Sequence, residues 1–171
     1  MRRGLFIGRF QPFHLGHLKV VQHILGLEDE LIIAVGSAQY SHTVDNPFTA
    51  GERIEIIRKT LKNSVDVDRV LIIPIPDIGE HRLWVSRVIS FSPEFQTVYS
   101  NNSLVKILFE EAGYRVEPVP FFDRERMMGR EIRKLISSGG DWRSRLHPEA
   151  VKYLEKIGAE KRLASILIND F

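Results

Sequence analysis

The chain alternates short apolar runs with amphipathic segments from its N-terminus to about residue 140. Each apolar run has the length and composition of a buried strand, and two of them close on a glycine. The runs are GLFIG (4–8), ELIIAVG (30–36), RVLIIPI (69–75), QTVYS (96–100) and RVEPVP (115–120). Strands that alternate with helices at this spacing form βαβ units, so the pattern predicts a parallel sheet in an α/β fold.

The amphipathic segments carry apolar residues at helical spacing and have helix start and stop signals. The segment 49–63 opens with Thr49 and has Glu52 three residues on, which is a capping-box pattern. The predicted helices cover 15–26, 49–63, 80–90, 103–113, 129–140, 149–158 and the residues after 158. We therefore expect one domain over 1–171, a Rossmann-like doubly wound parallel sheet with helices on both faces, and a helical tail over about 145–171.

In such sheets the ligand crevice lies beyond the carboxyl ends of the strands, near the point where the strand order reverses. The loops that follow the predicted strands are therefore the first places to look for a site. These loops are 8–14, 37–49, 76–84, 100–102 and 121–129.

Composition excludes several classes of protein. The chain has no cysteine, which excludes disulfides, zinc–thiolate sites and thiol catalysis. Its net charge is only +2, so neither a nucleic acid nor a membrane is expected as a partner. No run approaches the ~20 apolar residues of a membrane span. The start MRRGLFIG is interpreted as a buried strand rather than a secretion signal, because polar residues interrupt it, and a cytoplasmic location is expected.

The first of these loops holds two histidines, His14 and His17, at the start of the first predicted helix. Three residues apart, they would lie one turn apart on one helix face, where free N–H groups and the helix dipole attract anions. Histidine can donate from either ring nitrogen. Gly16 would let an anion approach the backbone closely, and Arg9 carries a planar fork suited to phosphate oxygens. The loop therefore predicts a polyphosphate site.

Two alternatives remain for the histidines. A histidine pair on a surface helix is often accidental, and a zinc site would need a third protein ligand, which the motif does not offer. The sequence contains neither a P-loop pattern nor a G-x-G-x-x-G pattern.

The segment GRFQPFHLGH (8–17) resembles the H-x-G-H signature of the nucleotidyltransferase superfamily. Further segments follow in order: GSAQYSHT, NPFTAGER, PDIGEHRLWV with Trp84, YSNN at 99–102 and GDWRS at 140–144. Together they resemble the archaeal-type nicotinamide-nucleotide adenylyltransferases, and the resemblance extends to about Glu149.

The resemblance implies an enzyme that joins ATP and nicotinamide mononucleotide (NMN) to give NAD and pyrophosphate. The NMN phosphate would attack the α-phosphorus of ATP in line, and Mg²⁺ would be bound mainly through the ATP phosphates. It also implies a homo-oligomer, with a hexamer as one candidate form. Two alternatives stay open: an adenylyl- or cytidylyltransferase for another phosphorylated acceptor, such as phosphopantetheine or glycerol phosphate, and a non-catalytic nucleotide sensor or RNA-binding module.

The resemblance assigns His14, His17 and Arg9 to catalysis. The residues expected to bind ATP are Gly8, Phe10, Gln11, Gly16, Asn102, Arg124, Gly129, Arg130 and Arg133. Arg133 would contact the β- and γ-phosphates. Met128 and Arg130 stand where small hydroxyl residues are expected, so the charge of Arg130 is a candidate replacement for hydroxyl contacts. The alternative for this segment is an ordinary amphipathic helix with a basic face.

Trp84, Asp77 and Ser37 are expected to bind the nicotinamide nucleotide. A tryptophan face stacks well on an aromatic cation. Taken alone, Trp84 is more typical of a core residue, and its place after the loop of the third strand, where the family has its nicotinamide-stacking tryptophan, favours the binding role. Asp77 would orient substrate hydroxyls or the amide, or else cap a turn. Thr49 and Arg53 are expected to cap and brace a helix, and Trp142 to pack in the core.

Overall fold

A computed structural model describes residues 1–169, with the side chain of Asn169 excepted. Its sheet has five parallel strands in the order β3-β2-β1-β4-β5. The strands are β1 (Arg3–Gly8), β2 (Glu30–Val35), β3 (Val70–Pro74), β4 (Thr97–Tyr99) and β5 (Arg115–Glu117). All five predicted strands are present and the predicted α/β class is confirmed, although β5 pairs over only three residues. The strand order reverses between β1 and β4, which places a switch point at the carboxyl end of β1.

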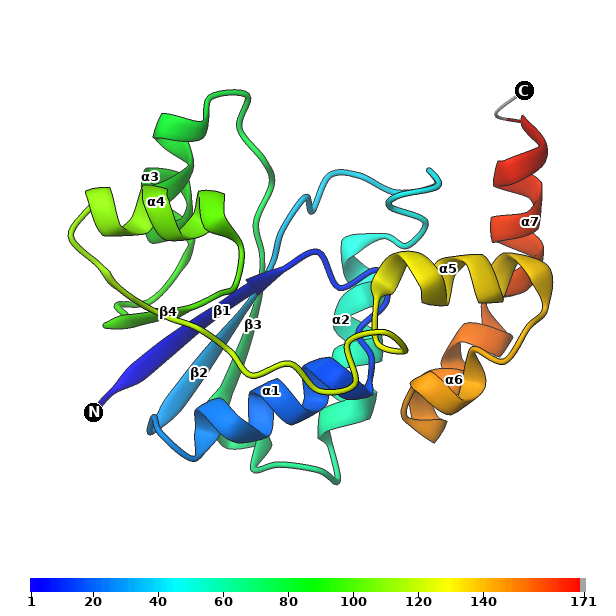
Figure 1. Cartoon of the computed structure of the whole chain (residues 1–171), viewed down its shortest axis with the longest axis horizontal. Coiled ribbons are helices and arrows are strands. Elements are labelled where there is room, and N and C mark those ends of the chain that lie inside the picture. The colour runs from blue at the N-terminus through cyan, green and yellow to red at the C-terminus, as the bar shows by residue number, and fades with distance from the viewer. Residues whose placement is uncertain (170–171) are drawn as a thin grey trace.

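The helices cover both faces of the sheet (Figure 1). They are α1 (Leu15–Leu25), α2 (Ala50–Leu61), α3 (His81–Phe91), α4 (Ser103–Glu111), α5 (Gly129–Ser138), α6 (Pro148–Lys156) and α7 (Ala159–Asn169). Successive side chains of a strand point to opposite faces of the sheet, so the core has two parts. Leu5 packs with α3 and α4 on one face, and Phe6 packs with α1 and α2 on the other. In Figure 1, α5, α6 and α7 lie beside α2, on the side away from the N-terminus.

Local signals account for where the helices begin and end. Thr49 caps α2 and forms the predicted capping box with Glu52. Asn102 caps α4 by accepting from the N–H groups of Leu104 at 2.9 Å and Val105 at 3.1 Å. Gly139, with φ of 69°, ends α5 in the left-handed region, as the glycines of this segment predict.

None of the helices described over residues 1–169 combines the length and the apolar character that a membrane crossing needs.

Candidate active site

His14 and His17 cap α1 by bonding to each other's backbone. The helix begins at Leu15, so His14 is its N-cap. The N–H of His17 donates to His14 Nδ1 at 3.3 Å, and the N–H of His14 donates to His17 Nδ1 at 3.2 Å. The two rings stack with their centroids 3.6 Å apart. Because each Nδ1 is an acceptor, a neutral imidazole at either position carries its proton on Nε2, and that nitrogen is the donor available to a ligand.

Both imidazoles are neutral at ordinary pH. Burial lowers the pKa of His14 from 6.5 to about 3. Burial, followed by the charge of His14 beside it, lowers the pKa of His17 well below its usual value. The pair therefore offers uncharged N–H donors at a helix start, where the backbone itself supplies partial positive charge.

Gly16 lies in close contact with the ring of His14. A Cβ on Gly16 would lie 3.0 Å from two atoms of the His14 ring and 3.0 Å from the Cβ of Met127. A side chain at this position would meet both groups, so glycine here makes room for the imidazole.

The side chain of Gln11 holds the turn between β1 and α1, and Phe10 in the same turn has an unusual backbone angle. Gln11 Nε2 donates to the carbonyl of Phe48 at 2.9 Å, and the N–H of Phe48 donates to Gln11 Oε1 at 3.0 Å. Gln11 is buried, so its amide group is engaged with the protein although it borders the site. Phe10, one residue before, has a φ of 52°, which a non-glycine residue adopts only when its surroundings impose it.

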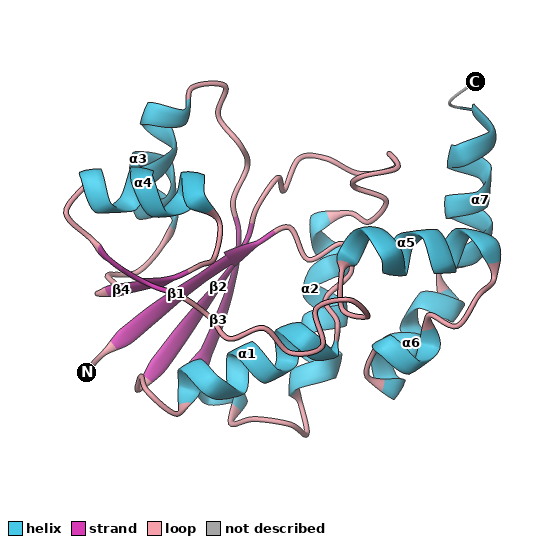
Figure 2. Ribbon diagram, viewed as in Figure 1, coloured by secondary structure: helices cyan, strands magenta, loops and turns pink. Residues whose placement is uncertain are grey.

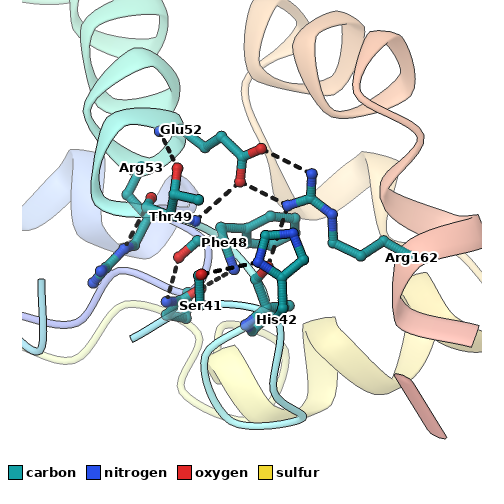
Figure 3. Close-up of polar contacts among 9 residues, drawn as sticks. Ser41, His42, Phe48, Thr49, Glu52, Arg53 and Arg162 are labelled. Carbon is teal, nitrogen blue, oxygen red and sulfur yellow. Dashed lines mark hydrogen bonds and ion pairs between the residues drawn. The ribbon is translucent and has the colours of Figure 1, made fainter. Parts of the chain in front are cut away.

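Arg53 joins the ends of two strands to the start of α2. Figure 3 shows it beside Thr49, the residue that caps α2. Arg53 is fully buried and donates to four carbonyls: Arg9 at 2.8 Å, Gly36 at 2.7 Å, Ser37 at 3.1 Å and Thr49 at 3.3 Å. Sequence analysis expected Arg53 to brace a helix. It does so, and it also fixes the backbone of Arg9 and of the loop after β2.

A second buried guanidinium, that of Arg133, reaches the same turn from α5. It donates to the carbonyl of Gln11 at 3.0 Å and pairs with Asp45 at 3.5 Å. Burial, and then the charge of Arg9, lowers the pKa of Arg133 and lowers that of Arg53 to about 10, so both stay cationic at neutral pH. Positive charge is thus concentrated around Arg9, whose own side chain is exposed, and this arrangement favours an anionic ligand.

Two cavities open at the carboxyl ends of the strands. Figure 2 shows the loops that leave the sheet at this edge. One, of about 520 Å³, is lined by His14 and His17 and is called here the histidine cavity. The other, of about 590 Å³, is lined by Trp84 and is called the tryptophan cavity. Both are lined by Ile7, Gly8 and Arg9. The switch point therefore separates two ligand-sized spaces with an arginine between them.

The structure brings most of the expected ATP-binding residues to the histidine cavity. Its lining includes Gly8, Arg9, Phe10, Gln11, His14, Gly16, His17, Arg124, Gly129, Arg130 and Arg133. Arg124 and Arg130 are exposed, and Arg124 lies over the ring of Phe121 at 4.5 Å. Gly129 is the first residue of α5, so the N-terminus of this second helix also faces the cavity.

The three residues expected to bind the nicotinamide nucleotide line the tryptophan cavity together. Ser37 Oγ donates to Asp77 Oδ2 at 2.7 Å, which ties the loop after β2 to the loop after β3. Trp84 is half-buried and meets Phe109 edge-on, with centroids 5.7 Å apart. Asn102, which was expected to contact ATP, lines this cavity rather than the histidine cavity.

Sequence analysis missed residues that shape the histidine cavity. Asn101 lines it and pairs its amide with both backbone groups of Val119, at 2.7 and 3.0 Å. Phe121 presents a largely exposed ring at its rim. The one available signal was the unusual pair of phenylalanines before the charged segment DRER.

Comparison with known proteins places this arrangement in a family. Residues 5–139 match the model of a cytidylyltransferase-like family. The chain is 50% identical to the nicotinamide-nucleotide adenylyltransferase of Saccharolobus solfataricus, over 99% of both chains. It is 49% identical to that of Methanothrix thermoacetophila, over 100% of this chain and 99% of the relative. The chain belongs to the nicotinamide-nucleotide adenylyltransferase family.

Membership confirms the expected family and the expected enzyme class, a nucleotidyltransferase. A solved structure agrees on the fold. A bifunctional NMN adenylyltransferase/ADP ribose pyrophosphatase from Francisella tularensis, complexed with AMP and manganese, superposes with a TM-score of 0.81 at 22% identity. This chain covers 52% of that longer protein.

Proposed function

We propose that the histidine cavity binds the triphosphate of ATP, that the tryptophan cavity binds NMN, and that Arg9 lies between their phosphates. The enzyme transfers the adenylyl group of ATP to NMN and releases pyrophosphate, as the family does. The observation that carries the assignment is that the two cavities share Gly8 and Arg9 at the strand switch point.

The triphosphate would meet donors of two kinds. His14 and His17 present Nε2–H groups at the start of α1, and the start of α5 lies across the same cavity. The exposed Arg124 and Arg130 supply mobile charge, so Arg130 takes the place of hydroxyl contacts. Arg133 is already bonded to the turn and acts on the β- and γ-phosphates chiefly through its charge.

The reaction needs positioning and charge neutralisation rather than a protein nucleophile. An ionised oxygen of the NMN phosphate forms a bond to the α-phosphorus, and the bond from that phosphorus to the bridging oxygen of the β-phosphate breaks. No proton has to be removed, because the attacking phosphate oxygen is already an anion. Arg9 would offset the repulsion between the two phosphates, and the donors of the histidine cavity would stabilise the departing pyrophosphate.

The NMN base would stack on Trp84, which gains both contact area and attraction between the ring face and a cation. The joined pair Ser37 and Asp77 would bond polar groups of the nucleotide in the same cavity.

A divalent ion, Mg²⁺ or a similar metal, would be held mainly through the phosphate oxygens of ATP. Within residues 1–169 no three histidine or acidic side chains gather as a metal cluster, and Asp45 is the acidic residue that lines the histidine cavity. This donor set suits an ion that keeps most of its water and bridges phosphates.

The test is to incubate the protein with ATP, NMN and Mg²⁺ and to measure NAD and pyrophosphate. Parallel reactions with nicotinate mononucleotide, phosphopantetheine and glycerol phosphate define the acceptor. Formation of NAD together with an equal amount of pyrophosphate supports the proposal. Turnover with a different acceptor and none with NMN would refute it.

A further inference from the structure

Arg162, on the C-terminal helix α7, forms a two-pronged ion pair with Glu52 of α2 (Figure 3). Its Nη1 lies 2.7 Å from Glu52 Oε2, and its Nη2 lies 2.8 Å from Glu52 Oε1. Nη1 also donates to the carbonyl of Pro47 at 3.2 Å. Both side chains are mostly buried, 18% and 17% exposed, and Arg162 lies outside the segment that matches the family model.

Glu52 and Pro47 connect Arg162 to the loop that holds the site. Glu52 Oε2 also accepts from the N–H of Thr49 at 2.9 Å, which closes the capping box of α2. The carbonyl of Pro47 also accepts from the N–H of His42 at 3.4 Å. Arg162 therefore contacts Pro47 directly and reaches Thr49 through Glu52. Between Pro47 and Thr49 stands Phe48, whose N–H and carbonyl are the two partners of the Gln11 side chain.

The lowered pKa of Glu52 indicates that its carboxyl group is ionised in this contact. Burial favours the neutral carboxyl, but hydrogen bonds from Arg162 and from the N–H of Thr49 outweigh it and lower the pKa. The pair is therefore ionised at neutral pH, and its geometry is that of a planar fork on a carboxylate.

We propose that Arg162 is a positioning residue for adenylyl transfer. By fixing Glu52 and Pro47 it holds the backbone of Phe48 against Gln11, and Gln11 in turn holds the turn that carries Arg9 and His14. The inference rests on the proposed function, because it assigns the purpose of this contact to the geometry of the triphosphate site.

Positioning explains the contact better than stability does. Compared with a pair of apolar residues, a buried ion pair gains little net stability, because taking both charges out of water offsets their attraction. The helix α7 has separate apolar anchors beside Arg162, since Ala159 and Leu163 are buried in the main core. The helix therefore stays docked without the ion pair, and the loss falls on the loop at 47–49.

The test compares Arg162→Met, which keeps a long apolar stem over Phe48, with Arg143→Met. Arg143 is a matched control, because it also pairs with two carboxylates of the C-terminal helices, Glu155 and Glu160, but touches no loop of the site. We expect Arg162→Met to lower kcat/KM for NAD formation on the order of tenfold at a temperature where the variant is fully folded, and to lower the melting temperature more than the control does, because Glu52 is left buried without its charge partner. Arg162→Lys should recover part of the loss, because an ammonium keeps the charge but not the fork.

Hydrogen exchange provides a second measurement that does not depend on activity. In Arg162→Met the Phe48 amide should exchange faster, while the amides of β2 keep their wild-type rates. Glu52→Gln keeps an acceptor for Thr49 but removes the charge, so combining it with Arg162→Met should cost little more than either change alone.

Unchanged kcat and KM in Arg162→Met, or a loss that the Arg143→Met control reproduces, would overturn the proposal. An absence of NAD formation by the wild-type protein would instead refute the proposed function. The exchange rates at Phe48 would still decide whether Arg162 holds the turn.

Discussion

His14 should make the folded protein sensitive to acid over a defined range of pH. Its pKa is about 3 in the folded chain against 6.5 for a free imidazole. Above pH 6.5 both states are neutral at this position, and stability does not depend on it. Below pH 6.5 the unfolded chain binds a proton that the folded chain refuses until about pH 3, so stability falls between these values. At about pH 5 the loss is about 2 kcal/mol for this residue alone.

The variant His14→Asn tests this reasoning, because asparagine is also a good N-cap but does not titrate. Thermal unfolding at about pH 7.5 and about pH 5 should show the wild-type melting temperature falling by about 5 °C more than that of the variant. The control is His23→Asn, the same change at an exposed position of the same helix, which should leave the wild-type difference in place. Equal acid sensitivity in wild type and His14→Asn would show that His14 is not held neutral by burial.

Three further changes test the site. His17→Ala removes one Nε2 donor and should lower kcat for NAD formation about a hundredfold without unfolding the protein, as circular dichroism would show. Trp84→Ala should raise the KM for NMN about tenfold and leave the KM for ATP nearly unchanged, whereas Trp84→Phe should retain much of the affinity. Arg53→Lys keeps a charge but not the fork that serves four carbonyls, and urea titration should show a loss of about 3 kcal/mol in unfolding free energy.

The sheet could be predicted from sequence because its signals are local. A strand buried on both faces, such as β2, must be apolar along its length, and the capping box at Thr49 lies within four residues. The loops with chemical side chains were predictable for the same reason, since each follows a strand. The predicted contents of both cavities therefore came together, apart from Asn102, whose neighbour Asn101 faces the histidine cavity instead.

The contacts that shape the site could not be predicted, because they join distant positions. Gln11 and Phe48 are 37 residues apart, and the local sequence around each of them is that of an ordinary loop. The contacts of Arg53 could not be predicted either. Its partners are backbone carbonyls, which every residue has, so the sequence does not indicate which ones it meets. The donor nitrogen of the histidines depends on which atoms their Nδ1 atoms meet, and a motif does not contain that information.

The site combines neutral histidine donors with charged arginines, and the free-energy cost of burying charge explains this combination. Arg53 and Arg133 already place two buried cations beside Arg9, and their lowered pKa values reflect that burial and that repulsion. A protonated imidazole at His14 would add a further buried charge, with no carboxylate partner among residues 1–169, and the folded chain avoids it by keeping the ring neutral. Neutral Nε2–H groups still donate to phosphate oxygens. Without substrate, the site therefore carries no charge on its histidines. The phosphates of the two substrates can neutralise the charges of the arginines. This balance predicts that ATP binding draws no proton to His14 between about pH 7 and about pH 5, because the free ring nitrogen, Nδ1, already accepts from the N–H of His17. Calorimetric titrations in buffers of different ionisation enthalpy would measure the proton uptake that accompanies ATP binding, and wild type and His14→Asn should show the same value; a smaller uptake in His14→Asn would refute this reasoning.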